Sequence, residues 1–126
     1  MTEETNKKIL VVEDDEDFLS ILKIKFAGEG LSIITAINGD EGISMAESEK
    51  PDLIISDVLM PKMDGIEMIK KIRVFDKNVI VIFLTNIKDE DYIKSMKELG
   101  ETDYLIKADL RINEIVNKVK EKLNLK

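Results

Sequence analysis

Polar side chains end four short apolar runs of this 126-residue chain. The side chains that follow the runs are those of Glu13, Asp14, Asp57, Thr85 and Lys107. Short runs rich in β-branched residues are typical of buried strands in a parallel sheet. All strands of such a sheet point the same way, and ligands bind at the edge formed by their carboxyl ends. We therefore expect these polar side chains to converge on one site.

Three of the converging side chains are carboxylates, which repel one another unless one is protonated or a cation lies between them. The chain contains no histidine and no cysteine, so a metal must be bound through oxygen. Oxygen ligands favour Mg²⁺, Ca²⁺ or Mn²⁺, and a small set of protein ligands with room for water suits Mg²⁺. An aspartate beside such an ion, a lysine and a hydroxyl can act as a nucleophile towards a phosphoryl group. The pattern thus favours phosphoryl chemistry at Asp57.

Segments of helical spacing separate the apolar runs. The expected strands cover residues 9–12, 33–37, 53–56, 79–84 and 104–106. A segment with apolar residues at helical spacing follows each strand, from Phe18 to Phe26 in the first case and from Ile112 to Leu123 in the last. Five strands each followed by a helix imply an α/β fold, a parallel sheet with helices on both faces. For a doubly wound sheet of five strands we expect the order 2-1-3-4-5, which makes strands one and three neighbours.

Residues at the ends of these segments predict where helices begin and end. Acidic residues at expected helix starts are Asp15 or Glu16, Asp89 and Asp109. Glycines at expected helix ends are Gly28, Gly30 and Gly100. Asn38 and Gly39 predict a turn before the second helix. The expected inner face of the fourth helix comprises Tyr92, Ile93, Met96 and Leu99.

The composition fits one folded domain, which we assign to residues 1–126. Apolar residues make up 44% of the chain and charged residues 36%, as in globular proteins. The net charge of −7 argues against nucleic acid or an anionic membrane as the main partner, since both require clustered cations. Residues 1–8 hold no apolar signal sequence, and the longest apolar run, residues 79–84, is too short to span a bilayer. We therefore expect a cytoplasmic location.

Together these motifs are similar to those of a known family. The acidic pair within residues 8–15, the loop of residues 57–65, Thr85 and the segment of residues 104–107 match that family in order and spacing. On these motifs the whole chain resembles the receiver domain of bacterial two-component response regulators, similar in architecture to the chemotaxis regulator. The resemblance implies a flavodoxin-like receiver fold and a phosphorylation-controlled signalling switch. It fits a stand-alone domain and equally a longer regulator with an output domain beyond Lys126.

The resemblance also implies a role for each residue of the acidic site. Asp57 is implied as the phosphoacceptor. Asp14 is implied as a direct ligand of Mg²⁺, and Glu13 as a ligand that acts mainly through a water molecule. Asp57 itself and the backbone carbonyl of Leu59 would complete the protein ligands, and Mn²⁺ could replace Mg²⁺.

The remaining residues are implied to respond to phosphorylation. Lys107 would pair with the phosphoryl group, Thr85 would move to hydrogen-bond it, and Tyr104 would turn inward. The donor would be a histidine kinase or a histidine phosphotransfer protein, because this chain has no histidine of its own. The fourth helix, fifth strand and fifth helix would then bind a downstream target or output domain. Such a domain is a signalling module and not an enzyme, although it assists its own phosphoryl transfer and slow dephosphorylation.

Two residues depart from the family pattern. Family members usually carry proline after the lysine, commonly behind a cis bond, whereas Ala108 follows Lys107 here. Because a cis bond without proline costs about 3–4 kcal/mol, we predict a trans bond and an altered loop that could loosen Lys107. The residue after the switch hydroxyl is usually small, and here it is Asn86. Its amide could contact the phosphoryl group or obstruct access to it, which bears on the lifetime of the phosphate.

The same residues also suit two other classes of protein. A metal-dependent phosphohydrolase with an aspartate nucleophile would use similar groups, but it needs an acid–base residue near the nucleophile and usually a cap domain. The residue two positions beyond Asp57 is Leu59, which cannot act as that acid. An interaction module of the same fold would need neither Mg²⁺ nor an acceptor, and the complete acidic set argues against it. Incubation with a small phosphodonor separates the three hypotheses.

Overall fold

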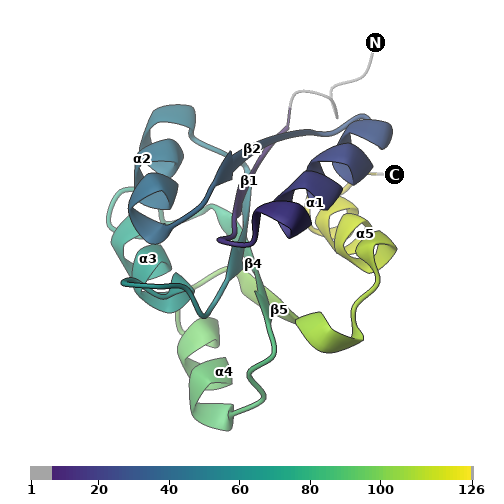
Figure 1. Cartoon of the computed structure of the whole chain (residues 1–126). Coiled ribbons are helices and arrows are strands. Elements are labelled where there is room, and N and C mark those ends of the chain that lie inside the picture. Colours follow the sequence, from purple (N-terminus) through teal and green to yellow (C-terminus); the bar gives the residue numbers. More distant parts are fainter. Residues whose placement is uncertain (1–6, 126) are drawn as a thin grey trace.

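A parallel sheet lies at the centre of the molecule (Figure 1). It has five strands in the order β2-β1-β3-β4-β5. The computed structural model describes residues 7–125, so the expectations for residues 1–6 and for Lys126 lie outside the described residues. The strands are β1 (Lys8–Val12), β2 (Ser32–Ala36), β3 (Leu53–Asp57), β4 (Ile80–Thr85) and β5 (Thr102–Ile106). The predicted α/β fold and strand order are confirmed.

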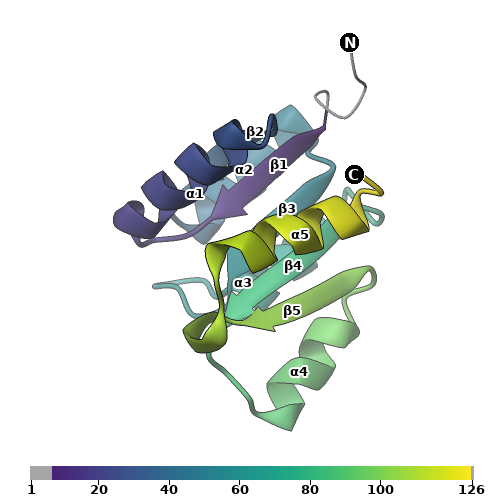
Figure 2. The same cartoon turned by 90° about the vertical axis from the view of Figure 1, so that its right-hand side faces the viewer.

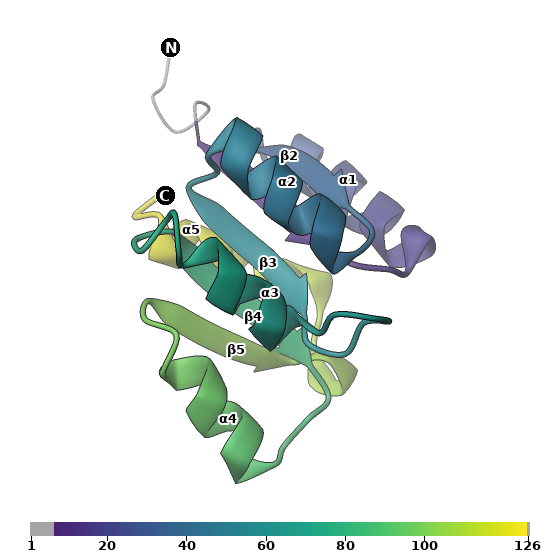
Figure 3. The same cartoon turned by 90° about the vertical axis from the view of Figure 1, so that its left-hand side faces the viewer.

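Helices cover both faces of this sheet, as predicted. They are α1 (Glu16–Gly28), α2 (Gly39–Glu49), α3 (Gly65–Ile72), α4 (Glu90–Lys97) and α5 (Ile112–Lys122), with a short 3₁₀ helix η2 (Lys107–Asp109) before α5. Figure 2 shows α1 and α5 on one face, and Figure 3 shows α2 and α3 on the other, with α4 at the β5 edge. Within residues 7–125, no helix combines the length and the apolar character that a membrane crossing requires.

Each central strand buries side chains on both faces of the sheet, because successive residues of a strand point to opposite sides. On β1, Leu10 and Val12 pack into the core on the α2 and α3 side, whereas Ile9 and Val11 pack into the core on the α1 and α5 side. All four side chains are completely buried. The strand sequences are therefore continuous apolar runs, and the first polar residue after each run marks the edge of the sheet.

Polar side chains cap the first four α-helices. The capping side chains are Asp15 of α1, Asn38 of α2, Asp64 of α3 and Asp89 of α4. Each accepts hydrogen bonds from backbone N–H groups that have no partner within the helix. The predicted caps Asp15 and Asp89 are confirmed. The predicted turn at Asn38 and Gly39 is wrong, because Asn38 caps α2 and Gly39 is the first residue of that helix.

The start of α5 also differs from the prediction. Asp109 is the expected cap of the last helix, but it lies in η2, and Arg111 occupies the cap position. The Arg111 N–H donates to Glu114 Oε1 at 3.0 Å, and the Glu114 N–H donates to the Arg111 carbonyl at 2.9 Å. The chain makes the turn η2 directly after β5, so the helix begins later and is capped by these two reciprocal bonds.

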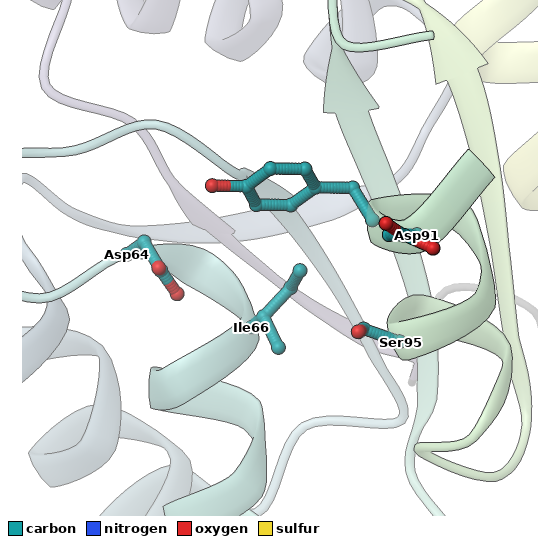
Figure 4. A pocket seen from close by; sticks show the side chains of 5 residues that line it. Asp64, Ile66, Asp91 and Ser95 are labelled. Carbon is teal, nitrogen blue, oxygen red and sulfur yellow. The ribbon is translucent and has the colours of Figure 1, made fainter. Parts of the chain in front are cut away.

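The buried face of α4 is narrower than predicted. Met96 is 1% exposed, but Tyr92 keeps 41% of its surface exposed. The reason is the place of α4 at the β5 edge of the sheet, where only part of the helix is covered (Figure 3). Tyr92 lines an open pocket of about 250 Å³ between α3 and α4. Figure 4 shows Asp64 and Ile66 on the α3 side of this pocket and Ser95 on the α4 side.

An ion-pair network joins β5 to α5. Asp103 Oδ2 lies 3.3 Å from both Lys118 Nζ and Lys122 Nζ. The Tyr104 N–H donates to Asp103 Oδ1 at 2.8 Å. Burial alone would raise the pKa of Asp103, but the Tyr104 N–H and the two ammonium groups together hold this pKa below its ordinary value. The ionised form of Asp103 is therefore favoured by folding.

The stability of the protein should consequently depend on acid pH through Asp103. Its contribution is complete above the ordinary aspartate pKa of about 3.9 and is lost as the pH falls through the lower pKa of the folded protein. We expect Asp103→Asn to lower the free energy of unfolding at neutral pH, and the difference from wild type to shrink below about pH 4. Urea unfolding at a series of pH values measures this, with Glu47→Gln on the exposed side of α2 as the control. A difference that stays constant down to acid pH would contradict the assignment.

Candidate functional site

The ends of the central strands bring the predicted side chains to one edge of the sheet. Val12 of β1 pairs with Ser56 of β3, and Thr85 of β4 pairs with Ile106 of β5. The residues that follow these pairs are therefore neighbours in space. The side chains that meet there are those of Glu13, Asp14, Asp57 and Lys107. Thr85 ends the adjacent strand, so the predicted convergence at this edge is observed.

Three carboxylates form the acidic part of the site. Ligand oxygens of Glu13, Asp14 and Asp57 lie within 4.8 Å of one another. Glu13 is 1% exposed, Asp57 is half-buried and Asp14 is exposed, so the cluster opens to solvent on the Asp14 side. An oxygen-only donor set with one open side fits a hard divalent cation that keeps some of its water ligands. The acidic cluster can therefore bind a metal ion.

Lys107 supplies the positive charge of the site. Its Nζ lies 2.7 Å from Glu13 Oε1 and 3.1 Å from Asp57 Oδ2. The same ammonium lies 4.9 Å from the centre of the Phe18 ring, a cation–π contact. The sequence suggests that the replacement of proline by Ala108 could loosen Lys107, but these contacts hold its ammonium between two carboxylates.

Burial and charge shift the pKa values of Glu13 and Lys107. Burial raises the pKa of Glu13, and the hydrogen bonds from Lys107 and from the Asp15 N–H offset only part of that rise. Burial alone would lower the pKa of Lys107, but the hydrogen bonds and charges of Glu13 and Asp57 outweigh it and raise the pKa above its ordinary value. Lys107 therefore keeps its charge at neutral pH.

Hydrogen bonds of the main chain fix Asp57 at the end of β3. Its Oδ1 accepts from the Val58 N–H at 2.9 Å, while Oδ2 faces Lys107. The Gly65 N–H donates to the Val58 carbonyl at 2.7 Å and closes the loop between β3 and α3. A Cβ on residue 65 would lie far inside van der Waals contact of the Asp57 carbonyl oxygen. The start of α3 is thus held directly against the backbone of Asp57.

Leu59 lies in the same loop, two residues after Asp57, and its side chain is 62% exposed. Only the backbone carbonyl of Leu59 could bind a metal ion, which is the role that the family resemblance implies. An open pocket of about 220 Å³ lies beside this loop, and Asp14, Lys62 and Met63 are among its lining residues. Asp14 belongs both to this pocket and to the acidic cluster, so the pocket borders the cluster on its solvent-exposed side.

Thr85 and Tyr104 lie on the neighbouring strands β4 and β5. Thr85 is 1% exposed, and its Oγ1 accepts a hydrogen bond from the Ile87 N–H at 2.9 Å. Tyr104 is half-buried, pairs with Phe83 in the sheet and packs against the core on the α3 and α4 side. Thr85 therefore anchors the segment that leads from β4 to α4.

Asn86 and Ala108, the two residues that depart from the family pattern, contact each other. The Ala108 N–H donates to Asn86 Oδ1 at 2.7 Å. The peptide bond between Lys107 and Ala108 is trans, as predicted, and residues 7–125 contain no cis peptide bond. From the sequence, the Asn86 amide is expected to contact the phosphoryl group or to obstruct access to it. In the structure, the side-chain oxygen of Asn86 binds the loop after β5.

Phe18 is a site residue that the sequence spacing does not identify. The spacing assigns it to the inner face of the first helix, and it does pack against the core on that side. Asp15 Oδ1 accepts from the Phe18 N–H at 3.1 Å, which fixes the first turn of α1 beside the acidic cluster. An aromatic residue in the first turn of a helix that starts at the functional edge of a sheet is the signal that could have identified it.

The molecule is a doubly wound α/β domain with an acidic cluster and a lysine at the carboxyl edge of its sheet, where domains of this fold bind their ligands. Residues 9–120 match the response regulator receiver domain, and the chain belongs to that family. It is thus a receiver domain of two-component response regulators, a phosphorylation-controlled signalling module. Receivers of this family interact with histidine kinases and output domains.

Two proteins of Bacillus subtilis (strain 168) are similar to this chain. The alkaline phosphatase synthesis transcriptional regulatory protein PhoP is 45% identical over 103 residues, which cover 81% of this chain and 42% of PhoP. Sporulation initiation phosphotransferase F is 38% identical over 121 residues, which cover 96% of this chain and 97% of that protein. The crystal structure of a two-component response regulator from Clostridium difficile is 33% identical, with a TM-score of 0.86 and coverage of 94% of this chain and 96% of that one. The chain therefore spans less than half of PhoP and nearly the whole of the other two.

Proposed function

We propose that residues 1–126 form a receiver domain in which Asp57 accepts a phosphoryl group from a phosphohistidine of a histidine kinase or a histidine phosphotransfer protein. One observation carries this proposal. The Asp57 carboxylate shares a cluster with two other carboxylates whose ligand oxygens lie within 4.8 Å of one another, and it lies 3.1 Å from the Lys107 ammonium. An acceptor aspartate requires both a cation-binding cluster and a fixed positive charge, since phosphoryl transfer depends mainly on positioning and charge stabilisation.

We assign Mg²⁺ to the acidic cluster, with Mn²⁺ as a substitute. Asp14, Asp57 and the Leu59 carbonyl would hold the ion directly. Both oxygens of Glu13 already accept hydrogen bonds, from Lys107 and from the Asp15 N–H, which supports a role for Glu13 through water. When bound, the ion supplies positive charge to the oxygens of the transferring phosphoryl group.

The chain's own residues position the nucleophile and the charge. An Asp57 oxygen forms the new bond to phosphorus while the bond from phosphorus to the donor imidazole nitrogen breaks, and the imidazole takes a proton from solvent. The Val58 N–H orients the Asp57 carboxylate through Oδ1. The Lys107 ammonium, 3.1 Å from Oδ2, lies where it can pair with the incoming phosphoryl oxygens, and its raised pKa preserves its charge.

Phosphorylation replaces the single negative charge of the Asp57 carboxylate with a phosphoryl group that carries about two, beside the end of β4. Thr85 Oγ1 would move to donate its hydroxyl hydrogen to the phosphoryl group, and because it accepts a hydrogen bond from the Ile87 N–H, the segment between β4 and α4 would move with it. Tyr104, now half-buried, would turn inward with this movement. The surface of α4, β5 and α5 would then change and bind a downstream target or output domain.

The two other hypotheses fit the site less well. A phosphohydrolase needs an acid near its nucleophile, and the residue two positions after Asp57 is Leu59, an apolar side chain that is 62% exposed. An interaction module that is never phosphorylated would not need a lysine between Glu13 and Asp57, where Lys107 lies. The site therefore favours a switch over an enzyme that turns over substrate.

Incubation with acetyl phosphate separates the three hypotheses. A receiver should take up at most one phosphoryl group per molecule, and only in the presence of Mg²⁺. A phosphohydrolase should instead release phosphate from many molecules of p-nitrophenyl phosphate per protein molecule. Failure to take up a phosphoryl group from any small donor would favour the interaction module.

A further inference from the structure

We propose that Asn86 is a positioning residue for Lys107, because its side chain binds the backbone of the loop that follows β5. The inference rests on the proposed role of Lys107 at Asp57. The last pair in the parallel ladder between β4 and β5 is Thr85 and Ile106. Asn86 directly follows this pair on the β4 side. Its side chain thus continues the connection between the two strands beyond the end of the sheet.

The hydrogen bond that makes this connection is short. The Ala108 N–H donates to Asn86 Oδ1 at 2.7 Å. This oxygen is the acceptor of the amide side chain, and the donor exists because residue 108 is not proline, which has no N–H. Asn86 and Ala108 are therefore a matched pair of acceptor and donor.

Lys107 is restrained at both of its ends. Its ammonium lies 2.7 Å from Glu13 and 3.1 Å from Asp57, and the peptide bond after it is tied to Asn86. Within the turn itself, the Leu110 N–H reaches the Lys107 carbonyl only at 3.4 Å. The 2.7 Å bond to Asn86 is thus the stronger of these two restraints on the backbone of the loop.

The same bond connects the Lys107 loop to Thr85. Asn86 lies between Thr85 and Ile87 in the chain, and the Ile87 N–H binds Thr85 Oγ1 at 2.9 Å. A movement of Thr85 would displace residue 86 and, through its side chain, the backbone at Ala108. Asn86 therefore acts through Lys107 and its loop, without touching the phosphoryl group.

Nuclear magnetic resonance of the unphosphorylated protein tests the bond directly. In Asn86→Ala, the Ala108 amide should exchange with water about three to ten times faster than in wild type, as expected when one exposed hydrogen bond is lost. The side-chain carbon signals of Lys107 should shift towards those of the exposed Lys70. Asn117→Ala, at an exposed position of α5, is the matched control and should change neither signal. Unchanged exchange at Ala108 and unchanged Lys107 signals in Asn86→Ala would overturn the proposal.

Phosphoryl uptake from acetyl phosphate tests the consequence. Asn86→Ala should slow uptake by about threefold to tenfold. Ala108→Pro already removes the backbone N–H of residue 108. When Asn86→Ala is added to Ala108→Pro, uptake should therefore change by less than about twofold. Equal slowing in both backgrounds would mean that Asn86 acts directly on the phosphoryl group, and faster uptake would mean that it obstructs the site. Either result would overturn the proposal.

The two measurements also separate this inference from the proposed function. If wild type and every variant fail to take up a phosphoryl group, the proposed function fails. The exchange of the Ala108 amide and the Lys107 signals still decide whether Asn86 holds the loop, because they are recorded without a phosphodonor.

Discussion

In an Asp14→Asn variant, phosphoryl uptake at low millimolar Mg²⁺ should fall by at least about a hundredfold, because even outer-shell residues of a metal site usually contribute about 10–100-fold to affinity. Asp14 is the exposed carboxylate of the cluster whose ligand oxygens lie within 4.8 Å of one another. Asparagine keeps its shape but removes the charge that a divalent cation requires. Uptake from acetyl phosphate, measured against Mg²⁺ concentration, gives both the apparent affinity and the maximal rate.

The adjacent acid provides a control for this prediction. Asp15 caps α1 through Oδ1, and asparagine is an equally good cap, so Asp15→Asn should keep both stability and uptake close to wild type. Higher Mg²⁺ or Mn²⁺ concentrations should restore part of the uptake in Asp14→Asn. Identical Mg²⁺ dependence in Asp14→Asn and wild type would exclude Asp14 as a direct ligand.

A second large effect is expected in Gly65→Ala, which should lower the free energy of unfolding by at least about 2 kcal/mol. The new Cβ would lie far inside contact distance of the Asp57 carbonyl oxygen and 3.0 Å from Ser56 Oγ. Ser56 Oγ donates to that same carbonyl at 2.8 Å, so neither group can retreat without moving the end of β3. Urea unfolding measures the loss of stability, and phosphoryl uptake reports the displacement of Asp57.

Gly28→Ala is the matched control for the loss of a glycine. Gly28 is the last residue of α1, and a Cβ there would meet no atom within 4 Å. Because alanine is favoured over glycine in a helix, we expect a gain of up to about 1 kcal/mol. A Gly65→Ala protein as stable as wild type would contradict the close packing described for the loop between β3 and α3.

The strands and the core of the site could be predicted from the sequence because one rule governs both. In a sheet covered on both faces, strands are continuous apolar runs, and the first polar residues after them lie at one edge. Asp57 and Lys107 are 50 residues apart in the chain, yet this rule predicts that they meet, and their side chains lie 3.1 Å apart. No knowledge of side-chain geometry is needed for that prediction.

The errors concern residues that suit two local structures equally well. Asp109 has the side chain of a helix cap, but the chain makes η2 first and α5 begins after Arg111. Asn38 is typical of a turn, and it is equally typical of a helix cap, which is its position here. Tyr92 has the spacing of a buried face, but α4 lies at the edge of the sheet and leaves this side chain 41% exposed.

The bond between Asn86 and Ala108 could not be predicted for a different reason. The two residues are 22 positions apart, and the bond depends on the rotamer of one exposed side chain just beyond the sheet. Strand register fixes the backbone at Thr85 and Ile106, but it does not determine which way the next side chain turns. Contacts of this kind require the three-dimensional structure.

The location of the phosphoryl group tests the central claim most directly. After wild-type protein is incubated with acetyl phosphate and Mg²⁺, intact mass spectrometry should show the added mass of one phosphoryl group, and peptide mapping should place it on Asp57. Asp57→Ala should show no added mass under the same conditions. An added phosphoryl group that persists in Asp57→Ala, or that maps to another residue in wild type, would contradict the assignment of Asp57 as the acceptor.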